Sequence, residues 1–347
     1  MNTNLLFRLY EIHSPSGRER KMRKFLKRQV FKYGASWVQD EHGNLLVTKG
    51  ASDSYPCLAS HMDQVQQKHS RDFRCVTGDD VVFGYSPKCH EQQGLGADDK
   101  NGIFICLECL RKYDVLKVAF FVGEESGCVG SSKVDLSFFS DCRYIIEPDR
   151  RGSRDLITEM FCGDVCSDDF IHAIGAERYG YKKERGSITD VGELVERGVG
   201  ISCLNLSCGY YEAHTDREFT VLSELNNCLD FVCDIIENVT DTYPYEYDKY
   251  SYYKGYGGGG YLYSGFSRDG YYEDGGYDMD FETMSRIIME EPGITFEKIL
   301  TDHFMSFWSY DEKELRNVYE DCVACMEGDS QEKWWEEDDA PDYYAAS

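Results

Sequence analysis

The stretch LKVAFFVGEESGCV, residues 116–129, runs from a continuous apolar segment directly into two adjacent carboxylates, Glu124 and Glu125. A continuous apolar run of this length is typical of a β-strand that is buried on both faces. Two like charges at its end repel each other, and burial nearby raises the cost of each one. The stretch therefore predicts a buried strand that ends beside something positively charged.

Other short apolar runs share this character, and helical or irregular segments separate them: YPCLASHMD at 55–63, CRYIIEPD at 142–149 and VGISCLNLSCG at 199–209. Buried strands that alternate with helices are typical of a parallel sheet with helices on both faces. We therefore predict an α/β fold with a mostly parallel central sheet that helices cover on both sides.

Two amphipathic helices are predicted near the ends of this region. Residues 14–34 carry apolar side chains at helical spacing, and Ser16 and Glu19 form a candidate capping box at the start. Residues 220–239 carry a second apolar stripe, formed by Leu225, Cys228, Leu229, Val232, Ile235 and Ile236.

The composition changes sharply after residue 238. Residues 239–280 are rich in Tyr, Gly and Asp without a stable apolar period, which is typical of a low-complexity linker. Helical patterning returns in 281–330 and predicts a small C-terminal helical module, and 331–347 predict an acidic tail. The sequence thus predicts one domain over 1–238, followed by the linker, the module and the tail.

Charge and cysteine content indicate which partners and which cellular compartment the protein is expected to have. The net charge is −26, of which −18 lies after residue 238, so nucleic acid and anionic membranes are not expected as partners. No run reaches the ~18 apolar residues of a membrane span, and the N-terminus does not resemble a secretory signal. We therefore expect the 15 cysteines to be reduced in a cytoplasmic protein.

Residues that bind metals recur where the predicted strands end, which is where open parallel sheets place their ligand sites. The candidates are His61 with Asp63, Asp98 with Asp99, Glu124 with Glu125, Asp149, and His214. Each motif alone is weak, because adjacent carboxylates are usually solvated and a single histidine is usually structural. Two histidines and three carboxylates, with one glutamate more, suit two zinc ions. A metal pair is also the positive partner that the two adjacent glutamates require.

Taken together and in order, the motifs LASHMDQV, GLGADDKNGI, FFVGEESGCVGS, IIEPDRRG and GYYEAHTDREF resemble the co-catalytic zinc exopeptidase superfamily, peptidase clan MH. This superfamily includes bacterial aminopeptidases, peptidase T, dipeptidases and aminoacylases. The resemblance covers about residues 5–238, and the segments SPSGRE at 14–19 and SITDVGEL at 187–194 are similar to the aminopeptidase branches.

The resemblance implies a ligand set for two zinc ions, with cobalt or manganese as possible substitutes. His61 and Asp149 would bind one ion, Glu125 and His214 would bind the other, and Asp98 would bridge the two. The residues of IIEPD leave two candidates for one of these positions. The DRRG that follows resembles the peptidase branches and favours Asp149, and Glu147 remains the alternative.

The resemblance also implies the catalytic roles. Glu124 would be the general base that deprotonates the water between the metals, and Asp63 would hydrogen-bond His61. The peptide bond between the positions of Asp98 and Asp99 is often cis in this family, so we expect a cis bond here.

The spacing of the motifs favours one branch of the superfamily. The interval from Asp149 to His214 is too short for the dimerisation lid of the carboxypeptidase and aminoacylase branches, and the interval from His61 to Asp98 is too short for an added domain. We therefore predict a lidless aminopeptidase that acts on peptides with a free N-terminus. The alternatives are a dipeptidase or an N-acyl-amino-acid deacylase, and an inactive peptidase-like interaction protein is less favoured.

Overall fold

The computed structural model describes residues 1–160, 163–247, 291, 293–302, 315–316 and 319–320. The chain divides into two compact units, Met1–Tyr261 and Leu262–Ser347. Most of the predicted linker, helical module and acidic tail lies outside the described residues, so this division into domains stays a prediction. Among the described residues, no helix is long and apolar enough to span a membrane.

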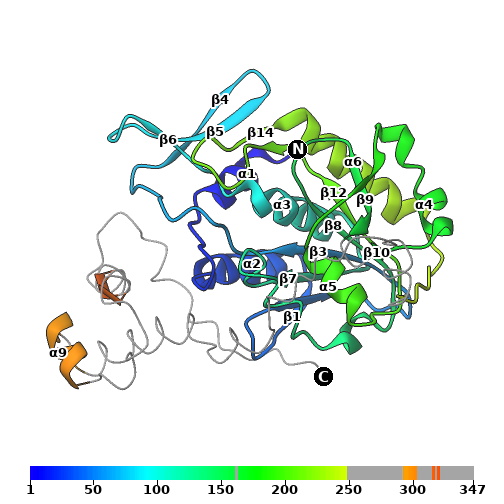
Figure 1. Cartoon of the computed structure of the whole chain (residues 1–347), viewed down its shortest axis with the longest axis horizontal. Helices are drawn as coiled ribbons and strands as arrows, with labels where there is room; N and C mark the ends of the chain where they lie inside the picture. Colours follow the sequence, from blue (N-terminus) through cyan, green and yellow to red (C-terminus); the bar gives the residue numbers. More distant parts are fainter. Residues whose placement is uncertain (161–162, 248–290, 292, 303–314, 317–318, 321–347) are drawn as a thin grey trace, which may run out of the picture. The chain divides into compact units, whose positions relative to one another are not determined.

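The first unit is built around a large mixed sheet (Figure 1). Its described strands are β1 (Ser36–Gln39), β2 (Leu45–Lys49), β3 (Tyr55–His61), β7 (Leu116–Phe121), β8 (Cys142–Arg150), β9 (Asp155–Met160), β10 (Gly163–Asp164), β11 (Lys182–Arg185) and β12 (Cys203–Ser207). They are ordered β1-β2-β7-β3-β8-β12-β9-β10, with β11 beside β9. The central strands β7, β3, β8 and β12 are parallel, and β1, β2, β9 and β10 join antiparallel. The predicted fold class is confirmed.

Successive side chains of the central strands enter two different cores. In β7, Val118 and Phe120 belong to one apolar cluster, whereas Ala119 and Phe121 belong to the other. Side chains of a strand alternate between faces, so a strand that is apolar at every position must be covered twice. This double burial explains the continuous apolar run at 118–122.

Helices supply the cover on both faces. The helical elements of this unit are α1 (Thr3–Tyr10), α2 (Arg20–Lys32), α3 (Ala97–Lys112), η1 (Leu136–Phe139), α4 (Asp168–Ile174), η2 (Ala176–Tyr179), α5 (Asp190–Glu196) and α6 (Leu222–Asn238). One core contains buried residues of α1, α2, α3, α4 and α6, and the other contains those of α5 and η1. The predicted stripe of α6 is buried throughout, from Leu225 to Ile236.

The start of α2 differs from the prediction, because the capping box does not form. The Ser16 hydroxyl donates a 2.7 Å hydrogen bond to Asp63, and the Glu19 carboxylate accepts the Gly17 N–H at 2.9 Å. The predicted apolar face is correct, since Met22, Leu26 and Val30 are buried. Sequence spacing alone could not reveal that Ser16 has a partner 47 residues away.

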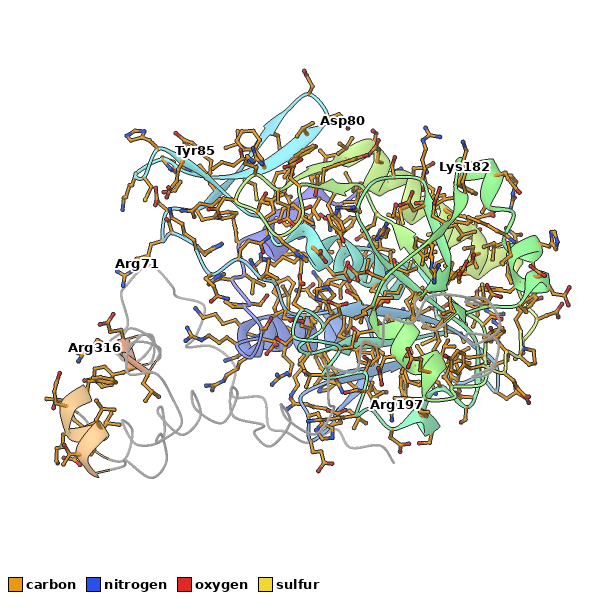
Figure 2. The ribbon with its side chains drawn as sticks, viewed as in Figure 1. Arg71, Asp80, Tyr85, Lys182, Arg197 and Arg316 are labelled. Carbon is orange, nitrogen blue, oxygen red and sulfur yellow. The ribbon has the colours of Figure 1, made fainter. Side chains whose placement is uncertain are left out.

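A second, smaller antiparallel sheet was not predicted. It contains β4 (Arg74–Gly78), β5 (Val81–Ser86), β6 (Glu91–Gln93), β13 (Tyr210–Tyr211) and β14 (Phe219–Val221). Figure 2 labels Asp80, the residue before β5, and Tyr85, near the end of this strand. These strands are short and partly exposed, so they lack the continuous apolar runs by which strands were recognised. Their functional importance is that the loop from β13 to β14 carries His214.

Little of the second unit is described. It contains the short helix α9 (Phe296–Asp302), where the Arg316 guanidinium lies 4.3 Å from the centre of the Phe296 ring. The Tyr319 hydroxyl donates to the Ile294 carbonyl at 2.7 Å.

Candidate active site

The sheet topology brings the predicted site residues to the edge of the sheet where the central parallel strands end. His61 ends β3 and is paired with Phe121, the last residue of the neighbouring strand β7, three positions before Glu124. Asp149 lies near the end of β8, on the other side of β3. Asp98 lies at the start of α3, where its backbone is not helical, and the bond that joins it to Asp99 is cis, as expected.

Two groups of side chains at this edge share one carboxylate. His61, Asp98 and Asp149 form one group, and Asp98, Glu125 and His214 form the other, with the possible ligand atoms within 4.8 Å of one another in each group. His61 Nε2 is 3.2 Å from Asp98 Oδ1 and 3.6 Å from Asp149 Oδ1. His214 Nε2 is 3.1 Å from both Asp98 Oδ2 and Glu125 Oε2. Asp98 therefore directs one oxygen to each group.

Asp63 connects this arrangement to the two adjacent glutamates. One of its carboxylate oxygens is 3.3 Å from His61 Nδ1, while its backbone carbonyl is 3.1 Å from the same nitrogen. The carboxylate also accepts the backbone N–H groups of Glu124 at 3.0 Å and Glu125 at 3.3 Å. One buried side chain thus orients an imidazole and fixes the turn that carries both glutamates.

Glu124 and Glu125 have different surroundings although they are adjacent. Glu125 faces His214, and its second oxygen, Oε1, is buried without a hydrogen-bond partner among the described residues. Glu124 Oε2 is 3.9 Å from His61 Nε2, outside both ligand groups. Burial raises the pKa of both carboxyl groups, and that of Glu124 well above its ordinary value.

The electrostatics of the site favour positive charge. Burial alone lowers the pKa of His61, but Asp149, Asp63 and Asp98 outweigh burial and raise this pKa well above its ordinary value. Burial raises the pKa of Asp98, but hydrogen bonds from His214 and His61 hold it well below its ordinary value. Carboxylates at this density therefore need a cationic partner, whether an imidazolium or a metal ion.

The donor set fits a pair of divalent metal ions. It offers two imidazole nitrogens and three carboxylates, a set that suits zinc in catalytic sites. The unpartnered Glu125 Oε1 is a buried acceptor that a cation would satisfy. The described residues therefore hold two ligand-like groups of the kind that binds a metal.

Glu147, the alternative ligand, lies in neither group. Its carboxylate accepts hydrogen bonds from the Thr189 hydroxyl and, at 3.2 Å, from the Val191 N–H. Asp149, by contrast, is next to His61. Of the two candidates in IIEPD, the structure brings Asp149 to the site.

Two residues support the site through contacts that the sequence did not predict. Asp99 accepts hydrogen bonds from the Ser60 hydroxyl at 2.5 Å and the His61 N–H at 3.2 Å, so it holds β3 against α3. Asn205 bonds both the N–H and the carbonyl of Asp149 at 3.1 Å. Asp99 had a visible signal in its paired aspartate, whereas Asn205 is one polar residue in an apolar strand.

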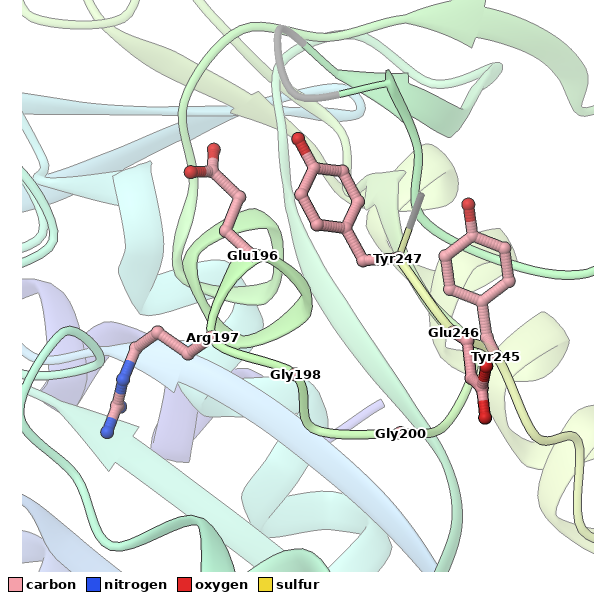
Figure 3. A pocket seen from close by; sticks show the side chains of 7 residues that line it. All are labelled: Glu196, Arg197, Gly198, Gly200, Tyr245, Glu246 and Tyr247. Carbon is pink, nitrogen blue, oxygen red and sulfur yellow. The ribbon is translucent and has the colours of Figure 1, made fainter. Parts of the chain in front are cut away.

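The described part of the chain also contains a surface cavity of about 250 Å³ that none of the predicted site residues lines. Residues 196–198, Gly200 and residues 245–247 line it (Figure 3). The Arg197 side chain points away from it and donates to the Ser131 and Val134 carbonyls.

No family model matches the sequence. The structure is similar to that of aminopeptidase PepT from Bacillus cereus, with a TM-score of 0.59 and 17% identity over 68% of this chain and 97% of the other. It is also similar to a tripeptidase from Staphylococcus aureus, with a TM-score of 0.57 and 16% identity over 69% and 97% of the two chains. For an aminopeptidase from the archaeon Desulfurococcus kamchatkensis the TM-score is 0.51, with 15% identity over 68% and 94%. The chain therefore has the fold of the zinc exopeptidases of clan MH.

Proposed function

We propose that this chain is a metallo-aminopeptidase, which binds two zinc ions and hydrolyses the N-terminal bond of peptides. The observation that carries the proposal is the shared position of Asp98, with one oxygen 3.2 Å from His61 and the other 3.1 Å from His214. A carboxylate between two ligand groups of the same composition is the arrangement that a two-metal hydrolase requires.

The proposed chemistry assigns different tasks to the two glutamates. A bound zinc pair lowers the pKa of water and polarises the scissile carbonyl. Glu124 accepts a proton from the attacking water and returns it to the leaving amine. Burial raises the pKa of Glu124, which suits a group that must both accept and donate a proton. The Asp63 carboxylate holds Glu124 in place by accepting the backbone N–H of Glu124.

The segment between Asp149 and His214 supports the aminopeptidase assignment over the deacylase alternative. Its described residues form the strands β9, β10, β11 and β12 of the main sheet, the helical elements α4, η2 and α5, and β13 of the second sheet. Residues of β9, β12, β13, α4, η2 and α5 belong to the two cores, and no separate lid forms among the described residues. The carboxylates around the site also provide partners for a substrate ammonium group.

The test of this proposal is a panel of peptides with free or acetylated N-termini, assayed together with the zinc content of the purified protein. We expect two zinc ions per chain and cleavage of unblocked peptides only. Faster cleavage of the acetylated peptides would support the deacylase alternative. A protein that binds no metal and cleaves neither set would support the inactive interaction protein.

A further inference from the structure

Glu218 is a buried carboxylate whose contacts all lead to the candidate site. It has no exposed surface and lies four residues after His214. Its two oxygens accept the backbone N–H groups of Ala97 at 2.9 Å and Asp98 at 3.3 Å, across 121 and 120 residues of sequence. It therefore connects the loop that carries one possible ligand to the backbone of another.

The N–H groups that Glu218 accepts lie at the start of α3, where the backbone of Asp98 and Asp99 departs from helical geometry. Buried backbone N–H groups outside a regular helical turn need an acceptor elsewhere. The preceding residue, Gly96, has a left-handed backbone (φ +62°) and no side chain that could act as a cap. A distant carboxylate thus takes the place of a local cap at the turn that presents Asp98.

A chain of buried hydrogen bonds fixes the Glu218 side chain. Lys100 Nζ donates to Gln64 at 2.6 Å, the Gln64 amide donates to Gln66 at 3.2 Å, and the Gln66 amide donates to Glu218 at 3.4 Å. Every donor along this chain points toward the carboxylate. Because each side chain is anchored at both ends, Glu218 has one position relative to Asp98.

The segment before α3 and the loop after β13 are also in close contact. A side chain at Gly94 would overlap the Gln66 side chain and the Thr215 carbonyl, which would lie 2.6 and 2.8 Å from its Cβ. Thr215 follows His214 directly, and its carbonyl accepts the Glu218 N–H at 3.3 Å. Any displacement of Glu218 therefore moves the His214 loop relative to Asp98.

We propose that Glu218 is a positioning residue, which holds Asp98 between the two ligand groups and sets the distance from Asp98 to His214. This inference rests on the proposed function, because it assigns Glu218 a role toward the metals that Asp98 would bridge. Partners of metal ligands commonly contribute about 10–100-fold to metal affinity.

The experiment compares Glu218→Gln with the full-length protein in zinc titrations and in assays at limiting and saturating zinc. Glutamine keeps the size of the side chain, but it places an NH₂ donor against one of the two N–H groups. We expect zinc affinity to fall about 10–100-fold and peptide hydrolysis to recover when zinc is saturating. With Co²⁺ as the probe, the visible absorption of the variant should differ from that of the unmodified protein.

The matched control is Glu212→Gln, which removes the same charge two residues from His214. The Glu212 side chain is half-exposed and pairs only with Arg217 in the described structure, at 3.3 Å. The zinc affinity of this variant should be unchanged. Equal zinc affinity and cobalt spectra for Glu218→Gln and Glu212→Gln would overturn the inference. So would a Glu218→Gln protein that fails to fold even in saturating zinc, since its role would then be structural.

Gln66→Met provides a milder test, because it removes one donor to Glu218 and keeps both bonds from the carboxylate to the backbone. We expect a folded protein with weaker zinc binding, and unchanged affinity would contradict the inference. Metal binding by the unmodified protein distinguishes failure of the proposed function from failure of the role of Glu218. If it binds no metal, the proposed function fails; if it binds two ions and the variants match it, only the role of Glu218 fails.

Discussion

At the scale of single residues, adjacent positions in the chain have different chemical surroundings. Glu125 Oε2 lies 3.1 Å from His214, while Glu124 Oε2 lies 3.9 Å from His61 and outside both ligand groups. Consecutive residues that leave a strand point in different directions, so both side chains cannot face the same partner. We therefore expect substitutions at the two positions to have different effects on zinc binding and turnover.

Glu124→Gln removes the proposed proton acceptor and keeps the size of the side chain. We expect normal zinc content and turnover reduced by about 10²–10⁴-fold, the usual contribution of a positioned general base. Glu125→Gln removes the proposed anionic zinc ligand, so zinc and activity should be lost together. Zinc content and kcat are measured for both, with Glu41→Gln as the control, because that side chain is exposed. Zinc loss in Glu124→Gln with retention in Glu125→Gln would reverse the two roles.

At the scale of elements, the junction between β3 and α3 depends on a glycine. Gly102 lies near the start of the regular part of α3, and a methyl group there would overlap the Asp99 carboxylate. Asp99 cannot move away freely, because it also accepts the N–H groups of His61 and Gly102.

Gly102→Ala should therefore destabilise the protein by about 1–3 kcal/mol, the usual cost of inserting a methyl group into a packed core. The gain in helix propensity, at most about 1 kcal/mol, is smaller. Gly78→Ala on β4 is the control, because nothing lies within 4 Å of the added Cβ, and its effect should stay within about 0.5 kcal/mol. Denaturant unfolding measures both, and equal stabilities would contradict the predicted overlap.

Three stacked rings join the segment before α2 to the connection between β3 and β4. His69 stacks on His13 at 5.0 Å and on Phe73 at 4.2 Å between ring centres. Burial lowers the pKa of His13 to about 4 and that of His69 to about 3. In the unfolded chain both groups bind a proton near pH 6.5. Between these pH values the unfolded state binds more protons, so stability falls as the pH falls from about 6.5.

His69→Phe should make the fold less sensitive to mild acid, because it keeps the stacked ring and removes one titrating group. Relative to the unmodified protein, we expect the variant to gain up to about 2 kcal/mol between pH 7.5 and pH 5. Denaturant midpoints at the two pH values measure this gain. His172→Gln, a change at an exposed position of α4, is the control. A constant difference between His69→Phe and the unmodified protein would show that His69 does not contribute to the pH dependence.

At the scale of the whole molecule, residues after α6 still belong to the packed part of the first unit. Tyr243 accepts the Ser202 N–H at 2.8 Å and donates its own N–H to the Arg143 carbonyl at 3.0 Å. Tyr245 donates its N–H to Gly200 at 3.1 Å. These bonds lie beyond residue 238, where the composition of the chain changes.

Truncations after residues 247 and 238 should therefore differ. The longer fragment is expected to fold, bind zinc and cleave peptides like the full chain. The shorter one loses three backbone hydrogen bonds, each with a net contribution of about 1 kcal/mol, so it should be about 3 kcal/mol less stable. Thermal and denaturant unfolding measure the difference. A soluble 1–247 fragment with full zinc but no activity would show that later residues are needed for catalysis.

The fold class and the order of the site motifs can be read from the amino-acid sequence. A continuous apolar run indicates a strand that is buried on both faces, and local composition is enough to encode it. Polar residues at the ends of such runs indicate the edge of the sheet where the parallel strands end. Sequence patterns and the family resemblance are therefore enough to place His61, Asp98, Glu125, Asp149 and His214 together.

The partners of individual polar groups depend instead on the three-dimensional packing. Ser16 bonds Asp63 instead of capping α2, Asn205 bonds the backbone of Asp149, and Glu218 bonds the first turn of α3. These partners lie 47 to 121 residues apart, so no local period records them. The second sheet escaped prediction for a related reason: its short strands are recognisable only through the pairing that holds them. Burial leaves a pattern along the chain, whereas a hydrogen bond between distant residues depends on the packing that brings them together.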